Sequence, residues 1–600
     1  MAAFDTRVTH PVEGWNAAIA AASGLGDHLG VIDLAARGLR EHPGSAPLEY
    51  AQLLAFARAG AGHEAETRLQ ALRQSGRLDS IADPGLRNNF AALAARLLKD
   101  RATEAEPAEQ ALLAARAAAA YEDVYLQSGE SYPAINAATL WRIAGDAGRA
   151  VKMVHAALAS VATERESYWT LATIAEARML LGDEPGAAAA FQAAVAAGAG
   201  RLSDIASTRR QLAWLAGIIG LGNKVVAAIP APQVVHWLAS PLNDPDAVVE
   251  LPAGIQTSAR DGPGLLAYGS ILSAADLAIG EALLLRDAKL HLVLPCAADI
   301  CRGLLATRGG SAAMARFDRL LSEARAVSEV TEVTLEGDPE EMTVLRLALI
   351  QARGLAMLRG AYLSTSVRVL LATPGHTDLR ELSPGTTDLD RLLAGWPDLG
   401  RADSIWSGRQ ARALVFGDVK GFSRISEKEH VAFLRVIVGG FADALATLNG
   451  AVEYAETAGD GLYVVLTDVA TAVRACHALH RAVVGPRLLA AGLPEDLGLR
   501  LSAHVGPVFH GLDRVTGREK FFGKEVIRTA RIEPITPPGE TYVTEQFASA
   551  LCCVTGGIYD CEYVGRQPMA KGFGECRMYT LRETRRRTST MISTTLIASS

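Results

Sequence analysis

The chain of 600 residues has few cysteines, no excess of basic charge and no long apolar run. Its seven cysteines show no paired CxxC spacing, which argues against structural zinc and favours a reduced, cytoplasmic protein. The formal net charge of −7 provides no basic footprint for nucleic acid or for an anionic membrane. We therefore expect neither nucleic acid nor a membrane as a partner.

Segments that would direct the chain into or across a membrane are also lacking. The most apolar helical stretch, Leu212 to Leu221, is too short to cross a bilayer. Residues Met1 to Pro11 have no apolar core for a signal peptide. Apolar content, in contrast, is ample: 49% of the residues are hydrophobic, and a chain of this length is expected to form about three domains.

Alanine and leucine dominate the first third of the chain. From about Trp15 to Leu221, apolar residues recur at helical spacing with few β-branched runs, which predicts successive helices. The turn Gly145-Asp146 returns 37 residues later as Gly182-Asp183, and a weaker copy of the repeat lies at Leu53–Gly60. This pattern resembles tetratricopeptide repeats, and Tyr132–Thr139 resembles the helical repeats that precede certain stress-signalling kinases.

A stack of such repeats leaves a concave face, which usually contacts a protein or another domain. We assign residues 1–221 to this helical repeat domain and expect a protein partner on it. The alternative is a scaffold that packs only against the rest of the chain.

Between about Asn223 and His376, short apolar runs alternate with helical stretches, as in a parallel sheet buried on both faces. The runs are Val225–Ala228, Leu265–Tyr268, Leu290–Leu294 and Val367–Leu371. In Tyr268–Asp276, a glycine and small hydroxyls separate a strand from a helix, where free amides can hold a phosphate. Because a full GxGxxG motif is lacking, a plain packing turn explains this segment equally well.

This middle region, residues 222–376, resembles the Rossmann-like nucleotide-sensing domains found beside signalling effectors. Residues 377–410 contain Pro-Gly and similar steps, which predict a linker. Residues 583–600 combine basic residues with serine and threonine and are predicted to form a disordered tail.

Two aspartates stand beside glycine turns in the last third of the chain. Asp418 follows the apolar run Ala413–Phe416, and Asp460 precedes the run Leu462–Leu466, so both carboxylates can lie at neighbouring strand ends. Asp beside Gly is also common in plain turns. Two hard carboxylates on paired strands suit magnesium, which keeps several waters and takes substrate phosphates as further ligands.

Three further segments follow downstream: Leu501–Val508, Phe522–Glu533 and Pro537–Thr544. Together with the two aspartate motifs, they resemble the class III nucleotide cyclase catalytic domain over residues 411–582. The expected fold class is multidomain α and α/β. It combines N-terminal helical repeats, a middle Rossmann-like parallel sheet and a C-terminal ferredoxin-like α+β cyclase domain.

The resemblance implies a role for each matching residue. Asp418 and Asp460 would ligate Mg²⁺ or Mn²⁺, two ions per active site. Arg531 matches the arginine that the opposite subunit donates to the transition state, and Lys571 matches a lysine that contacts phosphate. The loop that cradles the phosphates corresponds to Val419, Lys420, Gly421, Phe422 and Ser423. A chain with one such domain is expected to work as a homodimer.

Three positions depart from the adenylate cyclase pattern. Glu456 and Lys520 stand where adenylate cyclases have a lysine and an aspartate that bind the base. Ionised Glu only accepts hydrogen bonds and Lys only donates them, so the pair suits guanine or uracil, unless the two form a salt bridge and bind no base. Ile527 replaces the asparagine that orients the ribose, and we expect it to reduce turnover.

The sequence thus predicts a signalling enzyme that converts a nucleoside triphosphate to a 3′,5′-cyclic nucleotide and pyrophosphate, with guanine or uracil favoured over adenine. Two alternatives stay open at this point. One is a silent domain that binds nucleotide and signals without chemistry, which Ile527 suggests. The other is a scaffold whose repeats bind a protein.

Overall fold

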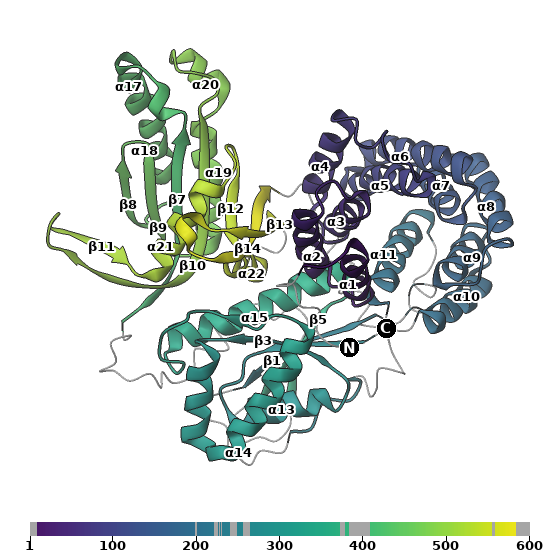
Figure 1. Cartoon of the computed structure of the whole chain (residues 1–600), viewed down its shortest axis with the longest axis horizontal. Helices are drawn as coiled ribbons and strands as arrows, with labels where there is room; N and C mark the ends of the chain where they lie inside the picture. Colours follow the sequence, from purple (N-terminus) through teal and green to yellow (C-terminus); the bar gives the residue numbers. More distant parts are fainter. Residues whose placement is uncertain are drawn as a thin grey trace.

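The computed structural model describes residues 9–198, 201–220, 226, 229, 231–239, 249–255, 264–372, 379–382, 408–554 and 559–583. Figure 1 shows a curved array of helices, an α/β part around a six-stranded sheet, and a part built on an eight-stranded sheet. The predicted multidomain α and α/β architecture is confirmed. The domain boundaries and the Rossmann-like character of the middle sheet stay predictions. No helix among the described residues is both long enough and apolar enough to span a bilayer.

The helical array curves into an open ring with α11 inside the curve (Figure 1). Its helices are α1 (Val12–Gly24), α2 (His28–Glu41), α3 (Ala46–Arg58), α4 (Gly62–Gln74), α5 (Pro84–Glu104), α6 (Pro107–Ser128), α7 (Ser131–Ile143), α8 (Ala147–Val161), α9 (Tyr168–Leu180), α10 (Glu184–Ala197) and α11 (Leu202–Ile219). In the repeated turn, Gly145 and Gly182 adopt left-handed φ angles of 89° and 84°, which favour glycine. Asp146 and Asp183 then cap the next helices, as the repeat pattern requires.

The middle sheet has the strand order β4-β3-β2-β1-β5-β6. Its strands are β1 (Gln233–Ala239), β2 (Leu265–Gly269), β3 (Lys289–Leu294), β4 (Thr331–Glu332), β5 (Val367–Ala372) and β6 (Leu379–Leu382), with helices α13 (Ala274–Leu284), α14 (Ala298–Val327) and α15 (Met342–Leu363). All neighbouring strands are parallel except β5 and β6. The predicted parallel sheet is therefore present.

Three predicted runs coincide with β2, β3 and β5, whereas Val225–Ala228 falls almost wholly outside the described residues. Strand β1 was missed because His236 and Trp237 interrupt its apolar pattern, although both side chains are buried. Strand β6 lies within the predicted linker 377–410, where buried Leu379 pairs with Ala372 at the edge of the sheet. Most of that linker and all but the first residue of the predicted tail lie outside the described residues.

The turn between β2 and α13 is a packing turn rather than an open anion site. The backbone amides of Leu272 and Ser273 donate to Asp276 Oδ2 at 3.1 and 3.0 Å, so the carboxylate of the chain itself occupies them. A Cβ atom on Gly269 would lie 2.1 Å from the Trp237 ring, which explains the glycine. The structure thus supports the packing interpretation of this segment and not the phosphate site.

Two buried histidines make the stability of the middle sheet depend on pH. Burial lowers the pKa of His236 and that of His291 to about 3. At these two histidines the folded state binds fewer protons than the unfolded state, so their contribution to stability is lost as the pH falls below about 6.5. Asp276 partly offsets this loss, because burial raises the pKa of its carboxyl group to about 7. We expect each histidine to reduce the free energy of unfolding by up to about 1.4 kcal/mol per pH unit in this range.

Urea unfolding of the middle part, followed between pH 7 and pH 4.5, measures this loss. Replacing His291 by Phe keeps an aromatic ring stacked on Tyr268, whose ring centroid lies 4.5 Å from that of His291, and should make the pH dependence shallower. Replacing exposed His155 by Gln is the control and should leave it unchanged. If the free energy of unfolding changes with pH equally steeply in His291→Phe and in the unaltered protein, this expectation is contradicted.

The C-terminal sheet has the strand order β13-β14-β12-β10-β7-β9-β8, and β11 pairs with β10. Its strands are β7 (Gln410–Lys420), β8 (Val452–Ala458), β9 (Gly461–Leu466), β10 (Gly498–Asp513), β11 (Arg518–Phe522), β12 (Thr541–Thr544), β13 (Tyr559–Pro568) and β14 (Glu575–Glu583). Its helices are α17 (Glu427–Phe433), α18 (Gly439–Ala446), α19 (Val469–Ala482), α20 (Gly485–Ala490), α21 (Lys524–Ile532) and α22 (Glu545–Val554). Val415 and Val464 belong to the main core, whereas the alternate residues Leu414 and Val465 belong to a smaller cluster on the other face.

The C-terminal part contacts both other parts of the chain. Asp33 on α2 accepts a 2.6 Å hydrogen bond from the Tyr563 hydroxyl and a 3.2 Å bond from the Arg566 amide, both on β13. Helix α22 packs on α15 so closely that a Cβ atom on Gly354 would lie 2.1 Å from the Ser549 carbonyl oxygen. One continuous hydrophobic cluster includes residues of all three parts.

Candidate active site

Asp418 and Asp460 lie close together, near the end of β7 and just before β9. The two strands are antiparallel, with Gly417 opposite Leu462. Burial, and next the Asp418 carboxylate, raise the pKa of Asp460. Two carboxylates this close repel each other, so the pair favours a shared cation. The structure brings the two predicted carboxylates together, and their role as metal ligands stays a prediction.

Arg500 and Glu533 complete this cluster, and neither was predicted. Arg500 on β10 stands opposite Asp418 in the β7–β10 register, and its Nη2 forms an ion pair with Asp418 Oδ2. Its Nε lies 3.0 Å from Glu533 Oε1. The signal in the sequence was an arginine that stands between two leucines, Leu499 and Leu501, near the start of this strand.

Glu533 shares the field of the two aspartates. Its side chain is 14% exposed. Burial first, together with the Asp418 and Asp460 carboxylates, raises its pKa to about 7 against the opposing effect of Arg500. Near neutral pH, Glu533 is therefore partly protonated, which limits the repulsion among the three carboxyl groups.

The donor set fits a divalent cation that is bound partly by its substrate. Among the residues that the structure describes, no group of three or more His, Cys, Asp or Glu side chains forms a complete metal site. Two carboxylates with substrate phosphates as further ligands are, however, the usual pattern for Mg²⁺. Because Arg500 already pairs with Asp418, a cation at this carboxylate has to compete with that ion pair.

The loop after Asp418 turns sharply away from the strand. Strand β7 ends at Lys420, Gly421 adopts a φ of 99°, and the short helix Phe422–Arg424 follows. The Phe422 ring packs on Phe433 with centroids 4.7 Å apart. Of the predicted phosphate loop, Val419 and Lys420 are thus the last paired residues of β7. Gly421, Phe422 and Ser423 form a tight turn that the aromatic contact anchors.

Glu456 and Lys520 meet as a salt bridge. Lys520 Nζ lies 3.0 Å from Glu456 Oε2, which also accepts a 2.7 Å hydrogen bond from the Tyr454 hydroxyl. These hydrogen bonds, that from Tyr454 first, lower the pKa of Glu456, and the bond to Glu456 raises the pKa of Lys520. The side chains of Lys520 and Glu456 are 36% and 41% exposed, so the bridge is weak and a base can compete for both groups.

Ile527, Arg531 and Lys571 come from α21 and the tip of the β13–β14 hairpin. Ile527 and Arg531 lie about one turn apart on α21, and 47% of the Ile527 side chain is exposed. Lys571 adopts a left-handed φ of 60° in the turn Ala570–Gly572, which contacts α21. Ile527 and Arg531 thus share one helix, and the turn that carries Lys571 contacts this helix.

A buried network fixes the start of α21. Glu525 lies 2.9 Å from His504 Nε2 on β10 and 2.9 Å from Arg528 one turn along the helix. His504 Nδ1 in turn lies 2.8 Å from Thr544 Oγ1 on β12. This chain of contacts ties α21, and with it Arg531, to two strands of the sheet.

Family models match two separate parts of the chain. The model "Tetratricopeptide Repeats-Sensor" covers residues 27–141, and the model "Adenylate and Guanylate cyclase catalytic domain" covers residues 408–583. The comparison with curated proteins gave no match.

Several solved cyclase structures are similar to the C-terminal part, all at low TM-score. Adenylyl cyclase CyaB from P. aeruginosa is 18% identical over 30% of this chain and 96% of its own, with a TM-score of 0.27. The guanylate cyclase domain of RhGC from Catenaria anguillulae, in complex with GTP, is 19% identical over 29% and 97%, with a TM-score of 0.25. Guanylyl cyclase Cya2 is 21% identical over 29% of this chain and 93% of its own, and its TM-score is also 0.25. On the family models, the chain carries a tetratricopeptide-repeat sensor region and, behind it, a catalytic domain of the class III adenylate and guanylate cyclase family.

Proposed function

We propose that the chain is a nucleotide cyclase that converts a nucleoside triphosphate to a 3′,5′-cyclic nucleotide and pyrophosphate. The observation that carries this proposal is the pair Asp418 and Asp460 at adjacent strands of a domain in the cyclase family. Mg²⁺ or Mn²⁺ held by these carboxylates would neutralise phosphate charge and lower the basicity of the ribose 3′-hydroxyl.

The remaining residues position and neutralise the triphosphate. Arg500, held between Asp418 and Glu533, is placed to receive phosphate oxygens once Asp418 takes another partner. Lys571 and the loop after Asp418 hold the phosphates. The 3′-oxygen then bonds to the α-phosphorus while pyrophosphate leaves. Arg531 carries a permanent charge and binds phosphate oxygens in a bidentate manner, which stabilises charge in the transition state.

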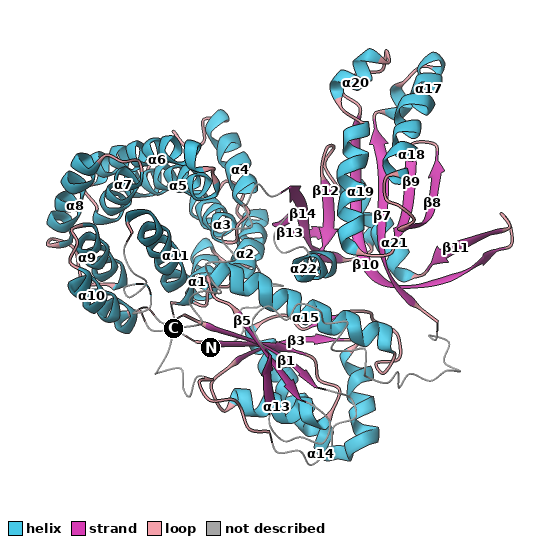
Figure 2. Ribbon diagram, turned by 180° about the vertical axis from the view of Figure 1, so that it is seen from behind, coloured by secondary structure: helices cyan, strands magenta, loops and turns pink. Residues whose placement is uncertain are grey.

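The active form is a homodimer in this proposal. Exposed apolar side chains gather on the β10–β11 hairpin and on α21: Leu512, Val515, Phe522 and Ile527. Figure 2 shows this hairpin projecting from the body of the domain. Such a surface is suited to a second copy, and a two-fold interface would place Arg531 of one subunit opposite the aspartates of the other. The repeats provide a separate surface for a protein partner.

Glu456 and Lys520 set the base preference in favour of guanine or uracil. We expect Glu456→Lys combined with Lys520→Asp to shift the ratio of kcat/KM values towards ATP by about a hundredfold, because the donors and acceptors are exchanged. Competition between ATP and GTP, with both cyclic products measured by mass, tests this. Glu323→Lys combined with Arg319→Asp on the exposed face of α14 makes the same exchange of charges away from the cyclase-family domain and is the control. A protein that already makes only cyclic AMP before substitution would contradict the assignment.

Ile527 lowers turnover because it cannot form a hydrogen bond to the ribose. We expect Ile527→Asn to raise kcat about tenfold, since it adds one polar contact at a half-exposed position without opening the core. Ile527→Ala is the matched control and should leave kcat within about threefold of the original value, because it adds no polar group. Equal rates for the Asn and Ala variants would show that this position has no role in turnover.

The direct test of the proposed function uses each of the four nucleoside triphosphates with Mg²⁺ or Mn²⁺. Product masses identify the cyclic nucleotide, and pyrophosphate release confirms cyclisation. Calorimetric binding without either product would instead favour a silent domain that signals by binding nucleotide, the alternative that Ile527 motivates.

A further inference from the structure

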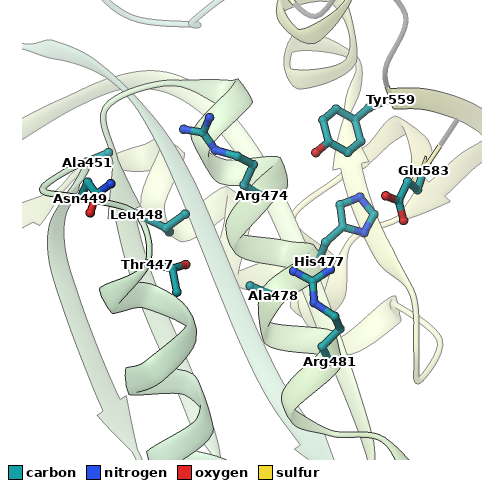
Figure 3. A pocket seen from close by; sticks show the side chains of 10 residues that line it. All are labelled: Thr447, Leu448, Asn449, Ala451, Arg474, His477, Ala478, Arg481, Tyr559 and Glu583. Atoms are coloured by element: carbon teal, nitrogen blue, oxygen red, sulfur yellow. The ribbon is translucent and has the colours of Figure 1, made fainter. Parts of the chain in front are cut away.

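A second cavity lies on the cyclase-family domain, away from the aspartates. It measures about 690 Å³ and is lined by the end of the α18–β8 turn, by one face of α19, and by the first and last residues of the β13–β14 hairpin. Figure 3 shows its side chains. Its volume is within the range of small-molecule sites.

Basic and polar side chains of α19 form one wall of this cavity. Arg474, His477, Ala478 and Arg481 share a helix face because they stand at positions i, i+3, i+4 and i+7. In Figure 3, the Arg474 guanidinium lies towards the Asn449–Ala451 turn and the Arg481 guanidinium lies beside His477. The two arginines are two helical turns apart, about 10.5 Å along the axis.

The opposite wall adds an aromatic ring and a single carboxylate. Tyr559 stacks on His477 with ring centroids 5.3 Å apart and an interplanar angle of 18°. Burial lowers the pKa of His477, and its buried Nε2 has no hydrogen-bond partner among the described residues. Glu583 is the only acidic residue that lines the cavity within the described part of the chain. The two guanidinium groups therefore outnumber the carboxylate.

The small side chain of Ala478 leaves space free within the cavity. It lies between the two arginines on the same helix face and lines the cavity with only a methyl group. A longer side chain at this position would project into the space, so it offers a substitution that blocks the cavity without changing its charge.

The cavity is distinct from the active site. The β8–β9 hairpin turns at Asp460, whereas Ala451 precedes the other end of the same hairpin. Lys571 lies at the tip of the β13–β14 hairpin, whereas Tyr559 and Glu583 pair at its base. At about 3.3 Å per residue, the cavity is on the order of 20 Å from Asp460 and 30 Å from Lys571.

We propose that this cavity binds a small anion with at least two phosphoryl groups, such as inorganic pyrophosphate or a nucleoside diphosphate. Arginine binds phosphate oxygens in a bidentate manner, and two arginines with long side chains on one wall provide donors for two phosphoryl groups, whereas a single phosphate would use only one of them. The concave shape and the small volume favour a small molecule over a protein surface. This site goes beyond the proposed catalytic function and does not depend on it.

Calorimetric titration of the full chain in the presence of a metal chelator tests the proposal. Inorganic pyrophosphate, inorganic phosphate and ADP serve as probes. The chelator removes divalent cations, so that the carboxyl groups of Asp418, Asp460 and Glu533 disfavour anions at the active site. We expect pyrophosphate and ADP to bind at least tenfold more tightly than phosphate. Arg474→Gln with Arg481→Gln, and separately Ala478→Leu, should each weaken pyrophosphate binding at least tenfold. The pair Arg514→Gln with Arg518→Gln on the exposed β10–β11 hairpin makes the same change in charge and should alter binding less than threefold.

Three results would overturn the proposal. The first is no pyrophosphate binding by the unaltered chain at 1 mM probe, about the weakest affinity that such a site should have. The second is equal loss in the α19 pair and in the control pair, which would indicate a general charge effect. The third is full binding in Ala478→Leu, confirmed as folded by its thermal transition, which would place the anion outside the cavity. Pyrophosphate binding should be unchanged in Arg500→Gln, which separates this cavity from the active site. The test of the cavity is therefore independent of cyclase activity.

Discussion

Replacing Asp418 and Asp460 together by Asn is expected to reduce cyclic nucleotide formation by at least about a thousandfold. The two carboxylates are close enough for burial and Asp418 to raise the pKa of Asp460, and Asn is nearly isosteric but carries no charge to hold a divalent cation. The loss should appear in kcat, because charge neutralisation matters most in the transition state. Product mass and pyrophosphate release at saturating Mg²⁺ or Mn²⁺ measure it.

Asp443→Asn on the exposed face of α18 is the matched control and should keep full activity. The double variant should remain folded. It loses the ion pair between Asp418 and Arg500, but it also removes the repulsion between the two carboxylates, and Arg500 keeps its ion pair with Glu533. Activity within tenfold of the original value, in a protein with an unchanged thermal transition, would refute the role of both aspartates.

Replacing Arg531 by Ala or by Lys is expected to lower kcat at least about a hundredfold with a smaller effect on KM. The guanidinium would bind developing charge in the transition state in a bidentate geometry that Lys cannot reproduce, so the Lys variant should not recover activity. Because the His504–Glu525–Arg528 network fixes α21 without Arg531, the variants should keep their fold.

Steady-state kinetics with the preferred nucleotide measure this effect. Arg319→Ala on the exposed face of α14 removes the same charge away from the cyclase-family domain and serves as the control. Recovery of more than a tenth of the activity in Arg531→Lys would show that only a positive charge, and not the shape of the guanidinium, is needed.

Local patterns in the sequence predicted much of the architecture and the core of the site. The Gly-Asp turns of the repeats form because glycine adopts the left-handed angle and aspartate caps the next helix. Asp418 and Asp460 were found because each adjoins an apolar strand run. These features depend on neighbouring residues, and local chemistry is sufficient to recognise them.

What was missed depends on contacts between residues far apart in the chain. Arg500 joins the aspartates only because the β7–β10 register places it opposite Asp418. The contact of Asp33 with Tyr563 spans 530 residues, so no local pattern indicates it. The salt bridge between Glu456 and Lys520 was one of two alternatives, and only the pairing of the strands decides whether the two side chains meet.

The most direct test of the account mixes two inactive variants. One subunit carries Asp418→Asn and Asp460→Asn, the other carries Arg531→Ala, and different affinity tags follow the heterodimer. If two subunits share each active site, random pairing restores about a quarter of the original activity, since half of the dimers are mixed and each has one intact site. Confirmed heterodimers that form no cyclic nucleotide would contradict the shared site.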